Sequence, residues 1–342
     1  MATVSTALAL ADGCEPLTAT DVDRLVDYVF AHRSAAIRAF LKEEGLKVSG
    51  SKDDLRNRIR QAIADGSIVA SGLVNLLDTI EGWGNQHIYL YQAPDGETKI
   101  WKSEARVRKR LQKIGQEELL NRRRPLVLPD EPTLSAVEWT KDRVRFIWVE
   151  KREWELRRGD LDLAVDGNGI HFKAYEHKVA RGITSFDWNL ATGEAALMIQ
   201  RLPSGERYDE IRQRYEDTIE DAVHVSNFSR RDVRKAIHKI EESKEASKRQ
   251  VAIETQRGGR ASFTSQSRKA DVFADPDLKK SRKAMGKTAS VLGNFYWLEA
   301  APHLERRLHV KLYATDQRMA LFGECTEAEV KYVLSRVCYH CQ

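Results

Sequence analysis

The 342-residue sequence predicts an α+β protein whose helical and β-rich regions follow one another along the chain. Apolar residues recur at helical spacing up to residue 84, whereas alternation of polar and apolar residues dominates residues 134–202. Short turns join the expected strands, which favours antiparallel pairing. No glycine-rich phosphate loop follows a strand, so a parallel nucleotide-binding sheet is not expected.

Changes in composition divide the chain into five segments, and its length supports about two or three structural units. We expect a flexible leader over residues 1–17, a helical domain over 18–84 and a β-rich domain over 85–225. A basic helix and mobile loop follow over 226–290, and a small α+β unit ends the chain over 291–342.

The most regular part of the helical domain is residues 34–66, where two amphipathic helices flank a turn. Their apolar stripes repeat at helical spacing and consist of Ile37, Phe40, Leu41, Leu55, Ile59 and Ile63. Gly45 stands where the first helix needs a left-handed residue to end, and Ser51 stands where the second needs an N-cap. Further helices that begin near Thr18 and after Gly66 complete a four-helix unit.

The turn and the start of the second helix form a candidate anion site. Backbone N–H groups and the positive end of the helix dipole lie there, and both favour a phosphate group. The residues that face water and supply hydroxyl groups, close backbone approach or positive charge are Lys47, Ser49, Gly50, Ser51, Lys52, Arg56 and Arg58. We expect Lys52, one residue beyond the cap, to hold one phosphate.

The segment LKEEGLKVSGSKDDLRNRI, residues 41–59, has the pattern Leu-x3-Gly-Leu-x-Val-Ser-Gly-x-Lys-x2-Leu-x3-Ile. In this pattern the chain resembles the SAP module, a helix–extended turn–helix unit that binds DNA. Asp53 and Asp54 depart from the family, in which a more neutral pair usually follows the lysine. The resemblance covers only a small part of the chain and implies DNA binding. The alternative is an ordinary helical hairpin in a protein-interaction scaffold.

The β-rich domain begins with residues 86–92, which alternate as a strand does. The turn at residues 94–96 is expected to return residues 98–101 as its partner strand, followed by a basic helix over residues 103–124 and hairpins over 134–202. Aromatic side chains here could stack on bases but more often belong to a core: Tyr89, Tyr91, Trp101, Trp139, Trp148 and Trp154. This domain is the candidate for a protein partner or a second nucleic-acid segment.

Positive charge concentrates between residues 230 and 287, where there are 17 Lys or Arg and 8 Asp or Glu, although the whole chain has a net charge of only +5. Charged helices are expected over residues 207–225 and 229–248, the second capped by Ser229. A mobile, glycine-containing loop then presents further DNA-binding candidates, Arg257, Arg260, Arg268 and Lys269. These side chains are expected to add affinity for any duplex without adding specificity.

A rival function rests on Glu176 and Lys178, which follow Asp162 and Asp166 in the chain. This spacing resembles the PD-(D/E)xK core of metal-dependent nucleases. The resemblance implies that Asp162 and Glu176 hold Mg²⁺ while Lys178 positions water. The surrounding sequence is typical of an antiparallel meander, and a solvated Glu–Lys ion pair is the simpler interpretation, so no metal or cofactor is expected.

The last segment is expected to contain two strands and a helix that begins with a capping box of Thr326 and Glu329. Cys338 and Cys341 stand at its end, and with Cys325 they supply three of the four ligands that a structural zinc site needs. We therefore interpret these cysteines as structural or incidental.

Composition also bounds the class of protein. No apolar run approaches the roughly 20 residues that cross a bilayer, and the N-terminus lacks the basic start of a signal peptide. Four cysteines do not form a disulfide framework in a chain of this length. We expect an intracellular protein without a membrane partner, in the cytoplasm, nucleoid or nucleus. Its expected function is architectural or recruiting: it binds the phosphate backbone of double-stranded DNA with weak sequence specificity.

Overall fold

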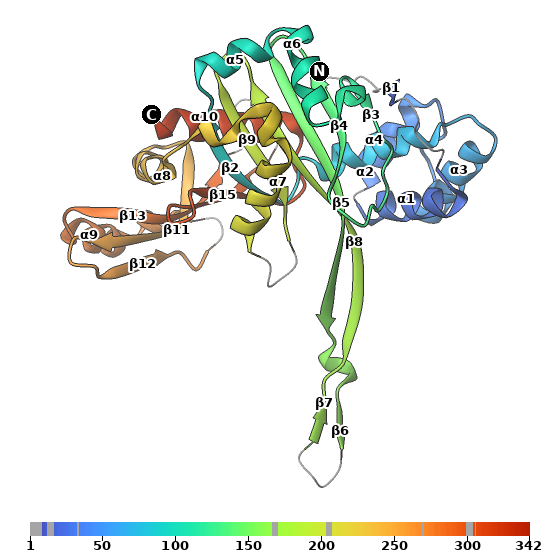
Figure 1. Cartoon of the computed structure of the whole chain (residues 1–342). Coiled ribbons are helices and arrows are strands. Elements are labelled where there is room, and N and C mark those ends of the chain that lie inside the picture. The colour runs from blue at the N-terminus through green and yellow to red at the C-terminus, as the bar shows by residue number, and fades with distance from the viewer. Residues whose placement is uncertain are drawn as a thin grey trace.

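The computed structural model describes residues 9–11, 17–32, 34–165, 170–202, 207–267, 270–298, 304 and 306–342. It confirms the α+β class, because helices surround one large, mainly antiparallel sheet (Figure 1). A four-helix unit lies at one end of this sheet, and a two-stranded arm projects from the body. Within these residues, no helix combines the length and the apolar character needed to cross a membrane.

The four-helix unit consists of α1 (Ala19–Ala31), α2 (Ser34–Glu43), α3 (Lys52–Ala64) and α4 (Ala70–Glu81). Thr18 and Ser51 cap α1 and α3, each in a capping box with the residue three positions later. The expected apolar stripes meet in a core of their own, and Leu46 and Val48 from the turn pack against it. Gly45 has a φ of 73°, as its expected left-handed role requires.

One hydrogen-bonded sheet runs through most of the remaining chain, in the order β1-β3-β4-β5-β8-β9-β2-β15-β14-β13-β11-β12, with β10 beside β2. Its longer strands are β2 (Gln86–Gln92), β4 (Thr133–Trp139), β5 (Arg143–Arg157), β8 (Tyr175–Asn189), β9 (Glu194–Gln200), β11 (Ala246–Thr255), β12 (Arg260–Thr264), β13 (Thr288–Trp297), β14 (Leu308–Tyr313) and β15 (Arg318–Phe322). Its short strands are β1 (Ala9–Leu10), β3 (Arg122–Arg123) and β10 (Ser229–Arg230). Because β2 pairs with both β9 and β15, the sheet crosses the segment boundaries expected near residues 225 and 290.

Helices cover opposite faces of the two halves of the sheet. Tyr89 and Tyr91 of β2 point into a core beneath α5 (Asp95–Trp101), α6 (Glu104–Lys113) and α7 (Tyr208–Val223). Ile88 and Leu90 point into a second core beneath α8 (Val233–Glu242) and α10 (Glu327–Cys341). A single strand serves two cores because successive side chains point to opposite faces. A smaller core joins α9 (Pro276–Ala284) to β11 and β12.

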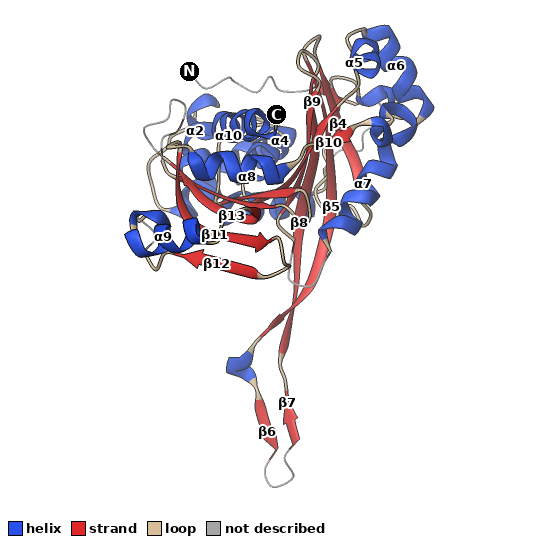
Figure 2. Cartoon of the chain, turned by 90° about the vertical axis from the view of Figure 1, so that its left-hand side faces the viewer, coloured by secondary structure: helices blue, strands red, loops and turns tan. Residues whose placement is uncertain are grey.

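The outer parts of β5 and β8 leave the body as a two-stranded arm (Figures 1 and 2). The pairing continues along both strands until Arg157 lies opposite Tyr175. Beyond it, β6 (Leu163–Val165) and β7 (Ile170–Phe172) form a small hairpin. Several large apolar side chains of the arm are exposed, namely Leu156, Leu161, Phe172, Tyr175 and Val179.

The expected partner strand of β2 is wrong, because residues 95–101 form helix α5. Asp95 and Glu97 lie in the first turn of this helix, where carboxylates are favoured by the helix dipole. Trp101 at its end is fully buried in the core. The strand β2 instead finds both partners, β9 and β15, far away in the sequence.

Three further expectations are corrected. The second charged helix, α8, begins at Val233 with Asp232 as its N-cap, whereas Ser229 lies in β10. The region expected to be a mobile loop is largely the β11–β12 hairpin, with Arg257 in its turn. Part of the expected leader is ordered too, because Ala9–Leu10 pairs with β3. Ala9–Leu10 and Ser229–Arg230 pair with strands far away in the sequence, and Arg260–Thr264 pairs with the adjacent β11. In each case strand pairing overrides the local composition.

Candidate nucleic-acid interface

Two arginines stabilise the turn between α2 and α3 by hydrogen bonds to its carbonyl groups. Arg38 donates hydrogen bonds to the carbonyl oxygens of Val48 and Gly50. Arg58 donates to the carbonyl oxygens of Lys47, at 2.6 Å, and Ser49, at 3.1 Å. Four consecutive carbonyl groups are therefore satisfied by two guanidinium groups.

The amide groups of the same four residues, 47–50, have no hydrogen-bond partner within the described chain. Gly50 has a φ of 125°, and a Cβ atom there would lie 2.9 Å from the Cβ of Asp54. Glycine is thus required at this position on both conformational and steric grounds. These amide groups lie beside the exposed side chains of Lys47, Ser49 and Lys52.

The N-cap of α3 is already occupied by a carboxylate from its own helix. The Ser51 hydroxyl and the Ser51 amide both donate to Asp54 Oδ2, at 2.8 Å each. These two hydrogen bonds lower the pKa of Asp54, and the one from the Ser51 side chain has the larger effect. Asp54 therefore remains charged at neutral pH and competes with any anion at the Ser51 hydroxyl. Its carboxylate also lies next to Gly50, so the amide groups of residues 47–49 are the better donors for an anion.

The two arginines of α3 that were named as DNA-binding candidates have partners in the protein. Arg56 lies 3.7 Å from Asp27 and 3.5 Å from Asp53, and its guanidinium lies over the ring of Phe30. Arg58 holds the carbonyl groups of the turn. The structure thus brings Lys47, Ser49, Gly50, Ser51 and Lys52 together at one surface and gives the two arginines supporting contacts beside it.

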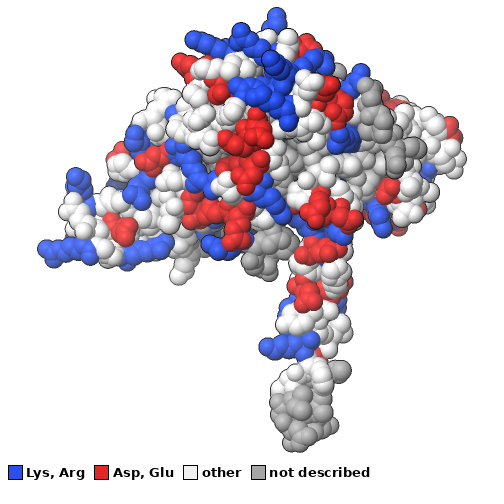
Figure 3. Space-filling model, in the orientation of Figure 1, with Lys and Arg blue, Asp and Glu red and all other residues white. Residues whose placement is uncertain are grey.

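The second group of candidates lies on the hairpin at the far end of the sheet. Arg257 and Arg260 are exposed at the turn of β11–β12, and Arg268 and Lys269 fall outside the described residues. Figure 3 shows basic side chains gathered at this end of the molecule.

A third basic surface was not among the candidates. Arg106, Lys109 and Lys113 are exposed on α6 at spacings of three and four residues, so they lie on one helix face. Figure 3 shows basic side chains at the top of the molecule, where Figure 1 places α6. The sequence pattern of this helix could have identified the row.

The residues of the nuclease alternative lie on the arm. Lys178 forms an ion pair with Glu176, which also contacts Arg158 at 3.0 Å. The carboxylate of Asp162 is instead held by Arg157. Asp166 falls outside the described residues. No group of three His, Cys, Asp or Glu side chains suited to a metal ion occurs in the part of the chain that the structure describes.

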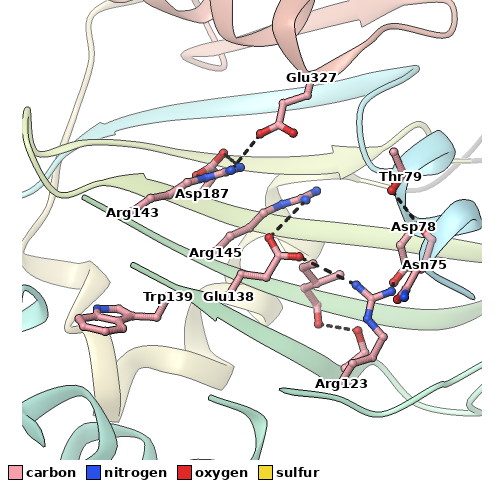
Figure 4. Close-up of polar contacts among 12 residues, drawn as sticks. Asn75, Asp78, Thr79, Arg123, Glu138, Trp139, Arg143, Arg145, Asp187 and Glu327 are labelled. Atoms are coloured by element: carbon pink, nitrogen blue, oxygen red, sulfur yellow. Dashed lines mark hydrogen bonds and ion pairs between the residues drawn. The ribbon is translucent and has the colours of Figure 1, made fainter. Parts of the chain in front are cut away.

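A buried ion cluster joins the four-helix unit to the sheet (Figure 4). Arg123 of β3 lies 2.7 Å from Asp78 of α4. On the sheet itself, Arg143 pairs with Asp187 of β8 and lies 2.9 Å from Glu327 of α10. The buried Arg123–Asp78 pair thus joins the helical unit to the sheet, and the partly buried Arg143 group joins the sheet to α10.

The aromatic residues proposed as possible stacking sites are mainly core residues. Tyr89, Tyr91, Trp101 and Trp148 are at most 2% exposed. Trp139 is partly exposed, but its indole N–H donates to the carbonyl oxygen of Trp101 at 2.7 Å. Trp154 is partly exposed where the arm begins.

The cysteines named in the sequence are poorly placed for chemistry. Cys338 and Cys341 lie within α10 and face the core beneath it. Burial raises the pKa of Cys338 to about 12 and that of Cys341 to about 11. Both thiols are therefore protonated at neutral pH.

No protein-family model matches this chain, and no curated protein matches it significantly.

Proposed function

We propose that the chain binds double-stranded DNA, mainly through phosphate groups, at the turn between α2 and α3. The observation that carries this proposal is the pairing of four consecutive carbonyl groups with Arg38 and Arg58, while the amide groups of residues 47–50 have no partner among the residues that the structure describes. Unpaired amide groups beside exposed lysines suit a phosphate oxygen. The resemblance of residues 41–59 to the SAP module supports the same proposal.

The other basic surfaces suit the same polyanion. Exposed cations on the β11–β12 turn and on α6 are sequence-independent contacts, since they neutralise phosphate charge without reading bases. We infer weak sequence specificity and an architectural or recruiting role. No metal or cofactor is part of this proposal.

Substitution of Lys52 by alanine tests the proposal directly. Lys52 is exposed, so the fold should be unchanged and only one phosphate contact should be lost. We expect the slope of log K against log salt to decrease in magnitude by about 0.9 for any duplex sequence. Fluorescence anisotropy with two unrelated duplexes across a salt series measures this slope.

Lys331→Ala is the matched control, because Lys331 is exposed on α10, away from α3 (Figure 1). It should leave the slope unchanged. Wild-type slopes for Lys47→Ala and Lys52→Ala, in folded proteins, would show that the turn does not contact DNA.

A further inference from the structure

The half of the sheet that contains β14 is covered by helices on one face. Leu308, Val310 and Leu312 of β14 are buried in the core beneath α8 and α10, and the side chains between them are partly exposed. Figure 2 shows α8 on one side of the neighbouring strand β13. The β14 side chains that point to the second face, His309, Lys311 and Tyr313, are partly exposed.

Three rings from adjacent strands form a row on this second face. Tyr296 of β13 lies opposite His309 of β14, and His309 lies opposite Phe322 of β15. The ring centroids are 4.8 and 4.4 Å apart, and the planes are within 26° of parallel. Asn294 Oδ1 lies 2.6 Å from His309 Nε2 and fixes the central ring. All three rings remain partly exposed.

Cationic side chains flank these rings. The guanidinium of Arg307 lies over the ring of Tyr296, 5.5 Å from its centroid. On the same face, Lys311 and Arg318 lie 4.9 and 4.5 Å from the centroid of Tyr313. Aromatic rings and positive charges therefore share one face of these strands.

Three cations act on His87, which lies on the same face of the sheet. Burial, and then the charges of Arg318, Arg201 and Lys311, lower the pKa of His87 to about 3. Asp316 offsets part of this field through its contact with Arg318 at 2.9 Å. Lys311 has no such carboxylate partner within the described residues.

We propose that this face, which we call the ring face, binds a single-stranded nucleic acid. The partly exposed edges of these rings offer unpaired bases aromatic contact, and the neighbouring cations neutralise the phosphates. A duplex would bring mainly its backbone to the ring face, because its bases are already stacked on one another. The ring face goes beyond the proposed duplex contact at the α2–α3 turn and shares no residue with it.

The test uses labelled oligo-dT and oligo-U of about 12 nucleotides, a length within the range that one such surface covers. Fluorescence anisotropy should show that Tyr296→Leu and Phe322→Leu each weaken binding at least about fivefold. Lys311→Gln should reduce the salt slope by about 0.7. If the substitutions weaken the binding of only oligo-dT or only oligo-U, the result identifies the preferred sugar and still supports the proposal.

Tyr339→Leu is the matched control, because the Tyr339 ring is 58% exposed on α10, outside the ring face. Its affinity should remain that of the wild type, and thermal melting should show that every variant is folded. No saturable binding of either strand, or wild-type affinity in folded Tyr296→Leu and Phe322→Leu, overturns the proposal.

Duplex binding separates the two proposals. Tyr296→Leu should keep wild-type affinity for duplex DNA, and Lys52→Ala should keep wild-type affinity for single strands. An equal loss of duplex and single-strand affinity in Tyr296→Leu would contradict a surface for unpaired strands. If Lys52→Ala keeps the wild-type salt slope while Tyr296→Leu weakens single-strand binding, only the proposed duplex contact is rejected.

Discussion

At the scale of single residues, His87 shows how burial sets a charge state. Its ring stacks on Tyr208 with centroids 3.9 Å apart, and Arg318 donates a hydrogen bond to its Nδ1. The acceptor nitrogen must be unprotonated, in agreement with a pKa lowered to about 3. The imidazole is thus neutral in the folded protein across the physiological range.

This depressed pKa predicts acid sensitivity. Below pH 6.5 the unfolded chain binds a proton at His87 and the folded chain does not, so stability falls as pH decreases toward 3. The loss is about 1.4 kcal/mol per pH unit. His87→Phe keeps a ring but cannot titrate, so its urea-unfolding free energy should fall less than that of the wild type between pH 6.5 and 5.0. An NMR titration of the His87 ring near pH 6.5 would contradict the prediction.

At the scale of elements, the arm formed by β5 and β8 lies outside the cores. No described residue between 153 and 180 belongs to a hydrophobic core cluster. Its charged side chains are satisfied mainly within the arm, as in the pairs of Arg157 with Asp162 and Lys178 with Glu176. The arm is therefore expected to contribute little to the stability of the body.

Removal of the arm tip tests this expectation. Replacing residues 158–174 by Asn-Gly closes the hairpin between Arg157 and Tyr175, which already lie opposite each other. The melting temperature should remain within about 2 °C, since none of the described residues removed belongs to a hydrophobic core cluster. Calorimetry measures it. A loss of cooperative unfolding would show that the tip is needed for the fold.

At the scale of the whole molecule, Arg181 of β8 connects the sheet to the four-helix unit. Its side chain is 0% exposed, donates to Glu81 Oε2 at 2.7 Å and pairs with Asp78. Burial alone would lower the pKa of Arg181, but the two carboxylates of α4 more than compensate and raise it. The helical unit and the sheet therefore share a buried ionic contact.

Arg181→Met should destabilise the protein by about 3 kcal/mol, because it leaves two carboxylates buried with fewer partners. Urea unfolding followed by circular dichroism measures this change. Arg207→Met is the control, since Arg207 is 76% exposed in its pair with Glu210 and should cost less than about 0.5 kcal/mol. Equal stability of the two variants would show that the buried pair contributes nothing to the docking.

The sequence alone determined the local structure of the four-helix unit. Helical spacing, the Ser51 cap and the left-handed Gly45 all depend on neighbouring residues, and the structure agrees with each. The pairing of Glu176 with Lys178 followed in the same way from strand alternation. Such features are local because helix caps and alternating side chains act over a few residues.

Only the tertiary structure decided which strands pair and which faces remain open. Residues 98–101 lost their expected strand because β2 pairs with β9 and β15. Arg318 meets His87 across 231 residues, and the row of Tyr296, His309 and Phe322 exists because three strands align. No local pattern encodes such a register, since hydrogen bonding between distant strands and burial of their shared faces select it together.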